Sequence, residues 1–115
     1  MLTLTDRASL RRAIRDPALG PRLRAVLRLR FEQLGGPGAH FHVAGPGDAL
    51  ADAQVAVGWP LAIDGEPQWE WAERHPGGFT ELVLILSDDG PAQVLLVPDG
   101  ASADLADLLR EHADG

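Results

Sequence analysis

Two histidines, His40 and His42, lie two residues apart in the segment 39–44, whose residues favour a β-strand. Side chains two positions apart on a strand point to the same face, so the two imidazoles are expected side by side. Such a pair can begin a transition-metal site, which needs at least one more ligand. Candidates for that ligand lie elsewhere in the chain: His75, His112, Asp48 and Asp52. A metal-binding protein or metal-dependent enzyme centred on His40 and His42 is one hypothesis, and a strand with a solvated polar face is the simpler one.

The segment Asp88-Asp89-Gly90 holds two adjacent carboxylates, which would suit ion binding or acid–base chemistry. An Asp-Gly pair also supplies the positive φ angles of a tight turn, and the residues that follow lack the regularly spaced oxygen ligands of a calcium loop. We therefore predict a turn here. The chain has no cysteine, no G-x-S-x-G motif and no phosphate-binding glycine motif, so we assign no catalytic residue and no cofactor.

Three of the six aromatic residues are tryptophans, and two of them, Trp69 and Trp71, alternate within the segment 68–75. If this segment is a strand, both indoles lie on one face and form a stacking platform for a partner. The segment also fits a helical turn, and tryptophans more often close the rim of a small core. Strand and helix both stay open for this segment.

Charge is divided along the chain. Residues 1–34 carry eight arginines and three acids, a net charge of +5, whereas residues 35–115 carry two arginines and fourteen acids, a net charge of −12. Clustered arginines are typical of nucleic-acid binding, but the acidic remainder and the overall charge of −7 disfavour it. A basic face that meets an acidic surface, on this molecule, a second copy or a partner, fits the division better.

A first helix is predicted from an N-cap at Thr5 through Asp16, where a proline follows. Its apolar residues repeat at helical spacing, and Arg11, Arg12 and Arg15 lie mostly away from that face. These three arginines are therefore candidates for contact with a partner.

A second helix is predicted over Pro21–Leu34, ended by the glycine-rich segment 35–38. Its apolar stripe is regular, except that Arg30 falls inside it. A guanidinium at such a position must reach a carboxylate or leave the core at an interface. Arg30 is therefore the residue that best shows whether the basic charge of this segment is neutralised inside the fold or binds a partner.

A β-hairpin is the clearest element of the acidic segment, with arms at Phe79–Ser87 and Gln93–Val97 around the predicted turn. Both arms are nearly continuous in apolar residues. A strand of this composition is covered on both faces, so the hairpin is expected at the centre of its sheet.

The remaining elements complete an α+β pattern. We predict strands at 39–44 and Leu61–Ile63, a helix from Asp48 to about Val57, and a final helix capped by Ser102. The expected fold is one domain over 1–115, with two N-terminal helices and a C-terminal helix packed on a small, mostly antiparallel sheet that contains the 79–97 hairpin.

All ten basic residues are arginine, and lysine, asparagine, tyrosine and cysteine are absent. Lysine, asparagine and tyrosine use AT-rich codons, so this bias indicates a GC-rich, bacterial genome. The lack of cysteine, of the layout of a secretory signal and of an apolar run of about 18 residues predicts a soluble cytoplasmic protein that does not enter the membrane.

No motif in these residues is specific to a family. We expect a small non-catalytic module that binds another protein or self-associates as a homodimer. The candidate partner-binding residues are Arg11, Arg12, Arg15, Arg30, Trp69 and Trp71. The alternatives are a metal protein centred on His40 and His42, and a nucleic-acid-associated protein that uses the arginine-rich helices.

Overall fold

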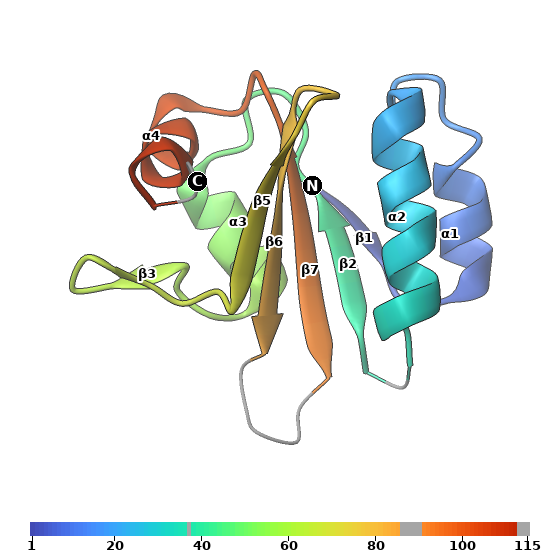
Figure 1. The fold of residues 1–115 in the computed structure, drawn as a ribbon, viewed down its shortest axis with the longest axis horizontal. Helices are drawn as coiled ribbons and strands as arrows, with labels where there is room; N and C mark the ends of the chain where they lie inside the picture. Colours follow the sequence, from blue (N-terminus) through green and yellow to red (C-terminus); the bar gives the residue numbers. More distant parts are fainter. Residues whose placement is uncertain (37, 86–90, 113–115) are drawn as a thin grey trace.

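The computed structural model describes residues 1–36, 38–85 and 91–112. Within them, four helices pack around a five-stranded mixed sheet, beside a separate two-stranded sheet (Figure 1). The α+β class expected from the sequence is confirmed. None of the described helices is long and apolar enough to cross a membrane.

Along the chain the elements follow the order β-α-α-β-α-β-β-β-β-β-α. Their bounds are β1 Leu2–Leu4, α1 Arg7–Ala13, α2 Pro21–Leu34, β2 His40–Val43, α3 Leu50–Val57, β3 Ala62–Ile63, β4 Glu66–Pro67, β5 Trp71–His75, β6 Phe79–Ile85, β7 Ala92–Pro98 and α4 Ala103–His112.

The main sheet has the strand order β1-β2-β7-β6-β5. Three of its pairings are antiparallel, but β2 runs parallel to β7, with His42 opposite Leu95. The expectation of a mostly antiparallel sheet is therefore met only in part. A parallel neighbour requires a crossover connection, and the long stretch of chain from α3 to β6 supplies it.

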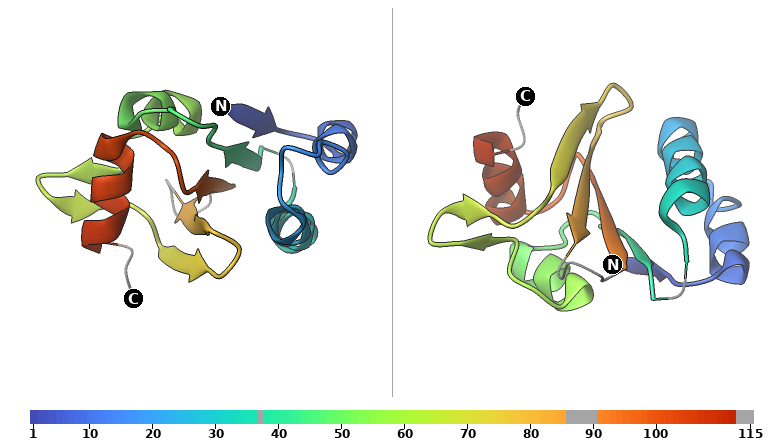
Figure 2. Two further views of the ribbon diagram at one scale, coloured as in Figure 1. Left: turned by 90° about the horizontal axis from the view of Figure 1, so that it is seen from above. Right: turned by 60° about the horizontal axis from the view of Figure 1, so that its bottom comes forward.

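Helices cover both faces of the sheet. Figures 1 and 2 show α1 and α2 on one side and α3 and α4 on the other. Two clusters of buried apolar residues match these sides, one with Leu23 and Leu27 of α2 and the other with Leu105 and Leu109 of α4. The central position of the hairpin, covered on both faces, is thus confirmed, because β6 and β7 contribute to both clusters. The predicted turn at 88–90 lies outside the described residues.

The chain begins with a strand that the sequence analysis did not predict. β1 pairs antiparallel with β2, and α1 starts only at Arg7, with Asp6 rather than Thr5 as its N-cap. Asp6 Oδ1 accepts a hydrogen bond from the Ser9 amide at 2.8 Å, and Ser9 Oγ accepts one from the Asp6 amide at 3.1 Å. This capping box satisfies two otherwise free amides, so it sets the helix start.

Helix α2 has the predicted bounds, and the ambiguous segment 68–75 contains a strand, β5. Helix α3 begins at Leu50 instead of directly after Asp48. The Asp48 carboxylate has other partners: it accepts from the Gly45 amide at 2.7 Å and pairs with the amino group of Met1 at 3.0 Å. Asp48 therefore ties the N-terminus to the loop that follows β2.

Candidate functional site

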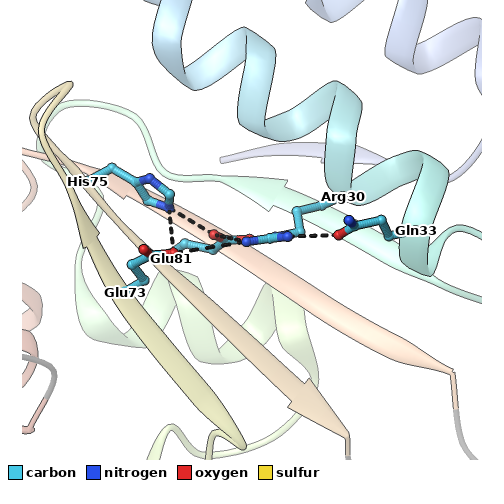
Figure 3. A network of polar contacts seen from close by, with 5 residues as sticks. All are labelled: Arg30, Gln33, Glu73, His75 and Glu81. Atoms are coloured by element: carbon cyan, nitrogen blue, oxygen red, sulfur yellow. Dashed lines mark hydrogen bonds and ion pairs between the residues drawn. The ribbon is translucent and has the colours of Figure 1, made fainter.

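A buried ion pair joins α2 to the sheet. Glu81 in β6 has no solvent-exposed surface, and Arg30 approaches it from α2 (Figure 3). The guanidinium donates twice, from Nε to Glu81 Oε2 and from Nη2 to Glu81 Oε1 at 3.2 Å. This two-pronged geometry is the strongest form of an arginine–carboxylate hydrogen bond. The arginine that breaks the apolar stripe of α2 thus reaches a carboxylate within its own chain.

The strand register brings further polar groups to the same place. Glu73 lies directly opposite Glu81 in the β5–β6 pairing, and His75 lies opposite Phe79. Residues paired in this way share one face of the sheet, here the face toward α2. His75 Nε2 is 2.8 Å from Glu81 Oε1 and 3.6 Å from Glu73 Oε2. The sheet therefore gathers two carboxylates and an imidazole beneath α2.

Three more contacts hold the cluster in place. Arg30 Nη1 donates to Gln33 Oε1 at 2.7 Å, and the guanidinium carbon lies 4.7 Å from the centre of the Trp71 ring. The His75 ring stacks on Phe79, with centroids 4.7 Å apart and planes 13° from parallel. Arg30 is thereby fixed on three sides, by a carboxylate, an amide and an aromatic face.

Glu73, His75 and Glu81 offer ligand atoms that all lie within 4.8 Å of one another, and they are the one such group of three found among the described residues. Two carboxylates and an imidazole could hold a divalent ion. However, the guanidinium of Arg30 already lies against both carboxylates, 4.0 Å from Glu73 Oε2. A divalent ion beside this permanent positive charge is repelled, so the cluster as arranged is a site for the chain's own cation.

A groove opens beside the cluster, between α2 and β5. Its volume is about 630 Å³, and Glu73 and His75 form part of its wall. The α2 side is apolar except for Arg22, and Leu29 on this side keeps 46% of its surface accessible. The polar cluster therefore lies at the wall of an open, mostly apolar groove.

The histidine pair of the metal hypothesis lies on the opposite face of the sheet. His42 is 1% exposed, with Nδ1 3.0 Å from Thr3 Oγ1 and Nε2 3.0 Å from Gln93 Oε1. Because the Gln93 oxygen accepts only, Nε2 carries the proton and Nδ1 accepts from the Thr3 hydroxyl. Both nitrogens of neutral His42 are engaged, and the ring of His40 lies edge-on to it with centroids 6.0 Å apart. Metal binding at this pair remains a prediction.

The pKa of His42 lies below its ordinary value. Burial of the ring is the main cause, since it disfavours the charged imidazolium, and the nearby His40 lowers the pKa further. The hydrogen bond with Gln93 acts in the opposite direction. His42 thus serves as a neutral link between β1, β2 and β7.

The two tryptophans of the platform hypothesis pack against opposite layers. Trp71 lies under Arg30 of α2, whereas Trp69 packs with the core on the α4 side, 6.3 Å from the His112 ring. Trp69 and Trp59 instead line a separate pocket of about 250 Å³. The structure therefore does not bring Trp69 and Trp71 together on one face.

The arginines of α1, α2 and the turn after α1, apart from Arg24 and Arg30, lie on the surface. The exposed ones are Arg7, Arg11, Arg12, Arg15, Arg22 and Arg28. In the part of the chain that the structure describes, none of these six is within ion-pair distance of a carboxylate. Arg11, Arg12 and Arg15, singled out from the sequence, belong to this surface, while Arg30 does not.

Sequence reasoning named Arg30 but missed its partner, Glu81. The signal was present, because Glu81 is the single charged residue within the apolar strand Phe79–Ile85. A lone carboxylate in a strand that must be covered on both faces needs a buried cation, as Arg30 needs a buried anion. The contributions of Glu73 and His75 depend on the β5–β6 register, which the ambiguity of segment 68–75 concealed.

No protein-family model, no curated protein and no solved structure matches this chain.

Proposed function

We propose that this chain is a non-catalytic protein-binding module that recognises an acidic surface of another protein through α1 and α2. The observation that carries the proposal is the set of six exposed arginines on α1, on α2 and in the turn after α1, none of which is within ion-pair distance of a carboxylate among the described residues. Exposed like charges repel one another, so an unpaired cluster gains most from a surface of opposite sign.

The acids of α4 cannot neutralise this cluster, because that helix lies on the other side of the sheet. Helix α4, on the far side of the sheet, carries Asp104, Asp107 and Glu111 against Arg110. Directly packed helices lie about 8–10 Å apart, and here a sheet intervenes. The screening length at physiological ionic strength is about 8 Å, so attraction across the sheet is weak. The division of charge along the sequence is therefore also a division between two faces.

Nucleic acid is the weaker candidate for the basic face. Single-stranded nucleic acids are held by aromatic side chains on which bases stack. Phe31, the aromatic residue within the basic segment, packs inward on Phe41 with ring centroids 5.1 Å apart. It is not available for stacking. The polar cluster is likewise engaged internally, since Arg30, His75 and Glu81 bind one another, and this favours binding over catalysis.

The test uses random peptides of about 12 residues displayed on phage, long enough to form one strand. We expect selected peptides to be rich in aspartate and glutamate. Their affinity should fall at least tenfold in the double variant Arg11→Glu/Arg15→Glu. The matched control is Arg110→Glu, which reverses an exposed arginine on α4 and should leave the affinity unchanged.

Three results would contradict the proposal. Selection could yield no acidic peptide, or the Arg11 and Arg15 variant could bind as well as the wild type. Tighter binding of short DNA than of any peptide would favour the nucleic-acid alternative. In the remaining case, the acidic surface is that of a second copy, and sedimentation at rising protein concentration tests it. A homodimer that dissociates in the Arg11 and Arg15 variant would show that the partner is a second copy and not another protein.

A further inference from the structure

A small pocket lies at the base of the β3–β4 hairpin (Figure 1). Its volume is about 250 Å³, and the described residues that line it are Trp59, Pro67, Gln68, Trp69, Glu70 and Ile85. Pockets for drug-sized ligands measure about 300–1,000 Å³, so this one has room for a small headgroup and not for a large ligand. Two of the three tryptophans of the chain line it, which makes it an aromatic pocket.

The two tryptophans belong to the two ends of the β3–β4 hairpin, and hydrogen bonds hold these ends together. Trp59 precedes β3, and Trp69 follows β4. The Gln68 amide donates to the Leu61 carbonyl at 2.9 Å, and the Leu61 amide donates to Gln54 Oε1 of α3, also at 2.9 Å. A pocket whose walls are fixed before binding loses little conformational freedom when a ligand enters, which favours affinity.

Both indoles have surface that a ligand can reach. Trp59 is 44% exposed, and Trp69 is only partly buried although one part of it packs with the core beneath α4. The face of an aromatic ring attracts a cation, and tryptophan does so most strongly. Two accessible indoles around one small space therefore favour a positively charged ligand.

The charge near the pocket favours the same kind of ligand. Glu70 is exposed, and it is the one charged residue among the described residues that line the pocket. Residues 57–70 contain two further acids, Asp64 and Glu66, and no basic residue. An anion would be repelled here, whereas a cation against the indoles is also attracted to the carboxylate.

The apolar walls select among cations. The ammonium of lysine is compact and strongly hydrated, so it loses much of its hydration against aromatic rings. A guanidinium carries several N–H donors, each of which needs an acceptor when water is removed. A quaternary ammonium group has no N–H donor, and its methyl groups can contact the faces of aromatic rings while its charge is attracted to them. This group fits two indoles and one carboxylate best.

We propose that the pocket binds a methylated ammonium group against Trp59 and Trp69, with Glu70 as its counter-charge. The group belongs either to a small molecule with a trimethylammonium headgroup or to a trimethylated lysine side chain, which share this chemistry. The inference goes beyond the binding of an acidic partner, because no described residue of the pocket belongs to α1 or α2. The two proposals therefore stand or fall separately.

The test follows the three indole N–H signals of the full chain by NMR spectroscopy while choline chloride is added. We expect saturable shifts of the Trp59 and Trp69 signals and no shift of the Trp71 signal, since Trp71 lies under Arg30 of α2. The matched probe is dimethylbutanol, in which an uncharged carbon replaces the nitrogen of choline. It has the same shape without the charge, so it should bind at least tenfold more weakly.

Substitutions show which side chains carry the binding. Trp59→Leu and Glu70→Gln each change an exposed residue, and each should weaken choline binding by about threefold or more. The control is Glu32→Gln, which neutralises an exposed carboxylate on α2 and should bind choline like the wild type.

Two short peptides that differ only in the trimethylation of one lysine distinguish the two sources of the ligand. Tighter binding of the trimethylated peptide than of choline identifies a modified protein as the ligand, and tighter binding of choline identifies a small molecule. The proposal is overturned if neither probe shifts the Trp59 and Trp69 signals, or if dimethylbutanol binds as tightly as choline. Binding of choline with wild-type affinity by both Trp59→Leu and Glu70→Gln would overturn it as well.

Discussion

Arg30 and Glu81 are opposite charges enclosed between α2 and the sheet. Their attraction offsets the free-energy cost of taking each charge out of water. Removing one partner of a buried pair leaves an uncompensated charge, which costs about 3–5 kcal/mol. We therefore expect Arg30→Met to lower the free energy of unfolding by about this amount. Urea unfolding at neutral pH measures it.

The double variant Arg30→Met/Glu81→Leu provides the control. Replacement of a whole buried pair by apolar residues is often neutral or stabilising, so most of the loss should be recovered. If the double variant were less stable than Arg30→Met, the contact with His75 would be enough to hold the Glu81 carboxylate, and the pair with Arg30 would not be the main link between α2 and the sheet.

His42 predicts a pH dependence of stability. Its pKa in the folded protein is below the ordinary 6.5, because burial disfavours the imidazolium, so unfolding takes up a proton below that pH. The stabilisation is complete above about pH 6.5 and is lost as the pH falls below it. The free energy of unfolding should therefore decrease from about pH 7 to about pH 5. The slope should be smaller in His42→Gln, and an unchanged slope would mean that another group causes it.

At the scale of the elements, the helix bounds and the hairpin that depend on neighbouring residues could be predicted from the sequence. The bounds of α2 follow from Pro21 and from the glycines after Leu34. The hairpin follows from two apolar arms, and its double cover follows from their continuity. These features depend on residues close together in the chain, so a single sequence reveals them.

Features that depend on distant residues were not predictable in the same way. Strand β1 has three residues and exists because β2 offers it an edge. The parallel pairing of β2 with β7 joins segments about fifty residues apart, for which no local pattern is diagnostic. For the same reason, the place of Glu73 and His75 beside Arg30 could not be predicted, because it depends on the register of β5 with β6.

A substitution at Gly77 tests the contact between α2 and the β5–β6 turn. A methyl group there would lie 2.8 Å from Arg22 Cβ and 3.1 Å from the Phe79 ring, so α2 or the turn must shift. Overpacking of this kind costs about 1–3 kcal/mol, and Gly77→Ala should be destabilised by that amount. Gly36→Ala is the control, because a Cβ at Gly36 meets no atom within 4 Å. Equal unfolding midpoints for both variants would contradict the close approach of the turn to α2.

On the scale of the whole molecule, the sheet separates helices α1 and α2, which carry a net positive charge, from helices α3 and α4, which carry a net negative charge. The separation explains how a chain with a net charge of −7 can still present a strongly basic face. Binding through exposed arginines depends on ionic strength, because salt screens charges that lie in solvent. The buried pair between Arg30 and Glu81 is screened much less, so it stabilises the fold without contributing to that dependence.

The most direct measurement of the central claim is the dissociation constant of one selected acidic peptide as a function of salt concentration. We predict steady weakening with added salt for the wild type and a clearly smaller dependence for Arg11→Glu/Arg15→Glu, since fewer arginines then contribute to binding. Affinity that is independent of salt, or equal salt dependence in the wild type and the variant, would contradict recognition of an acidic partner by the exposed arginines of α1 and α2.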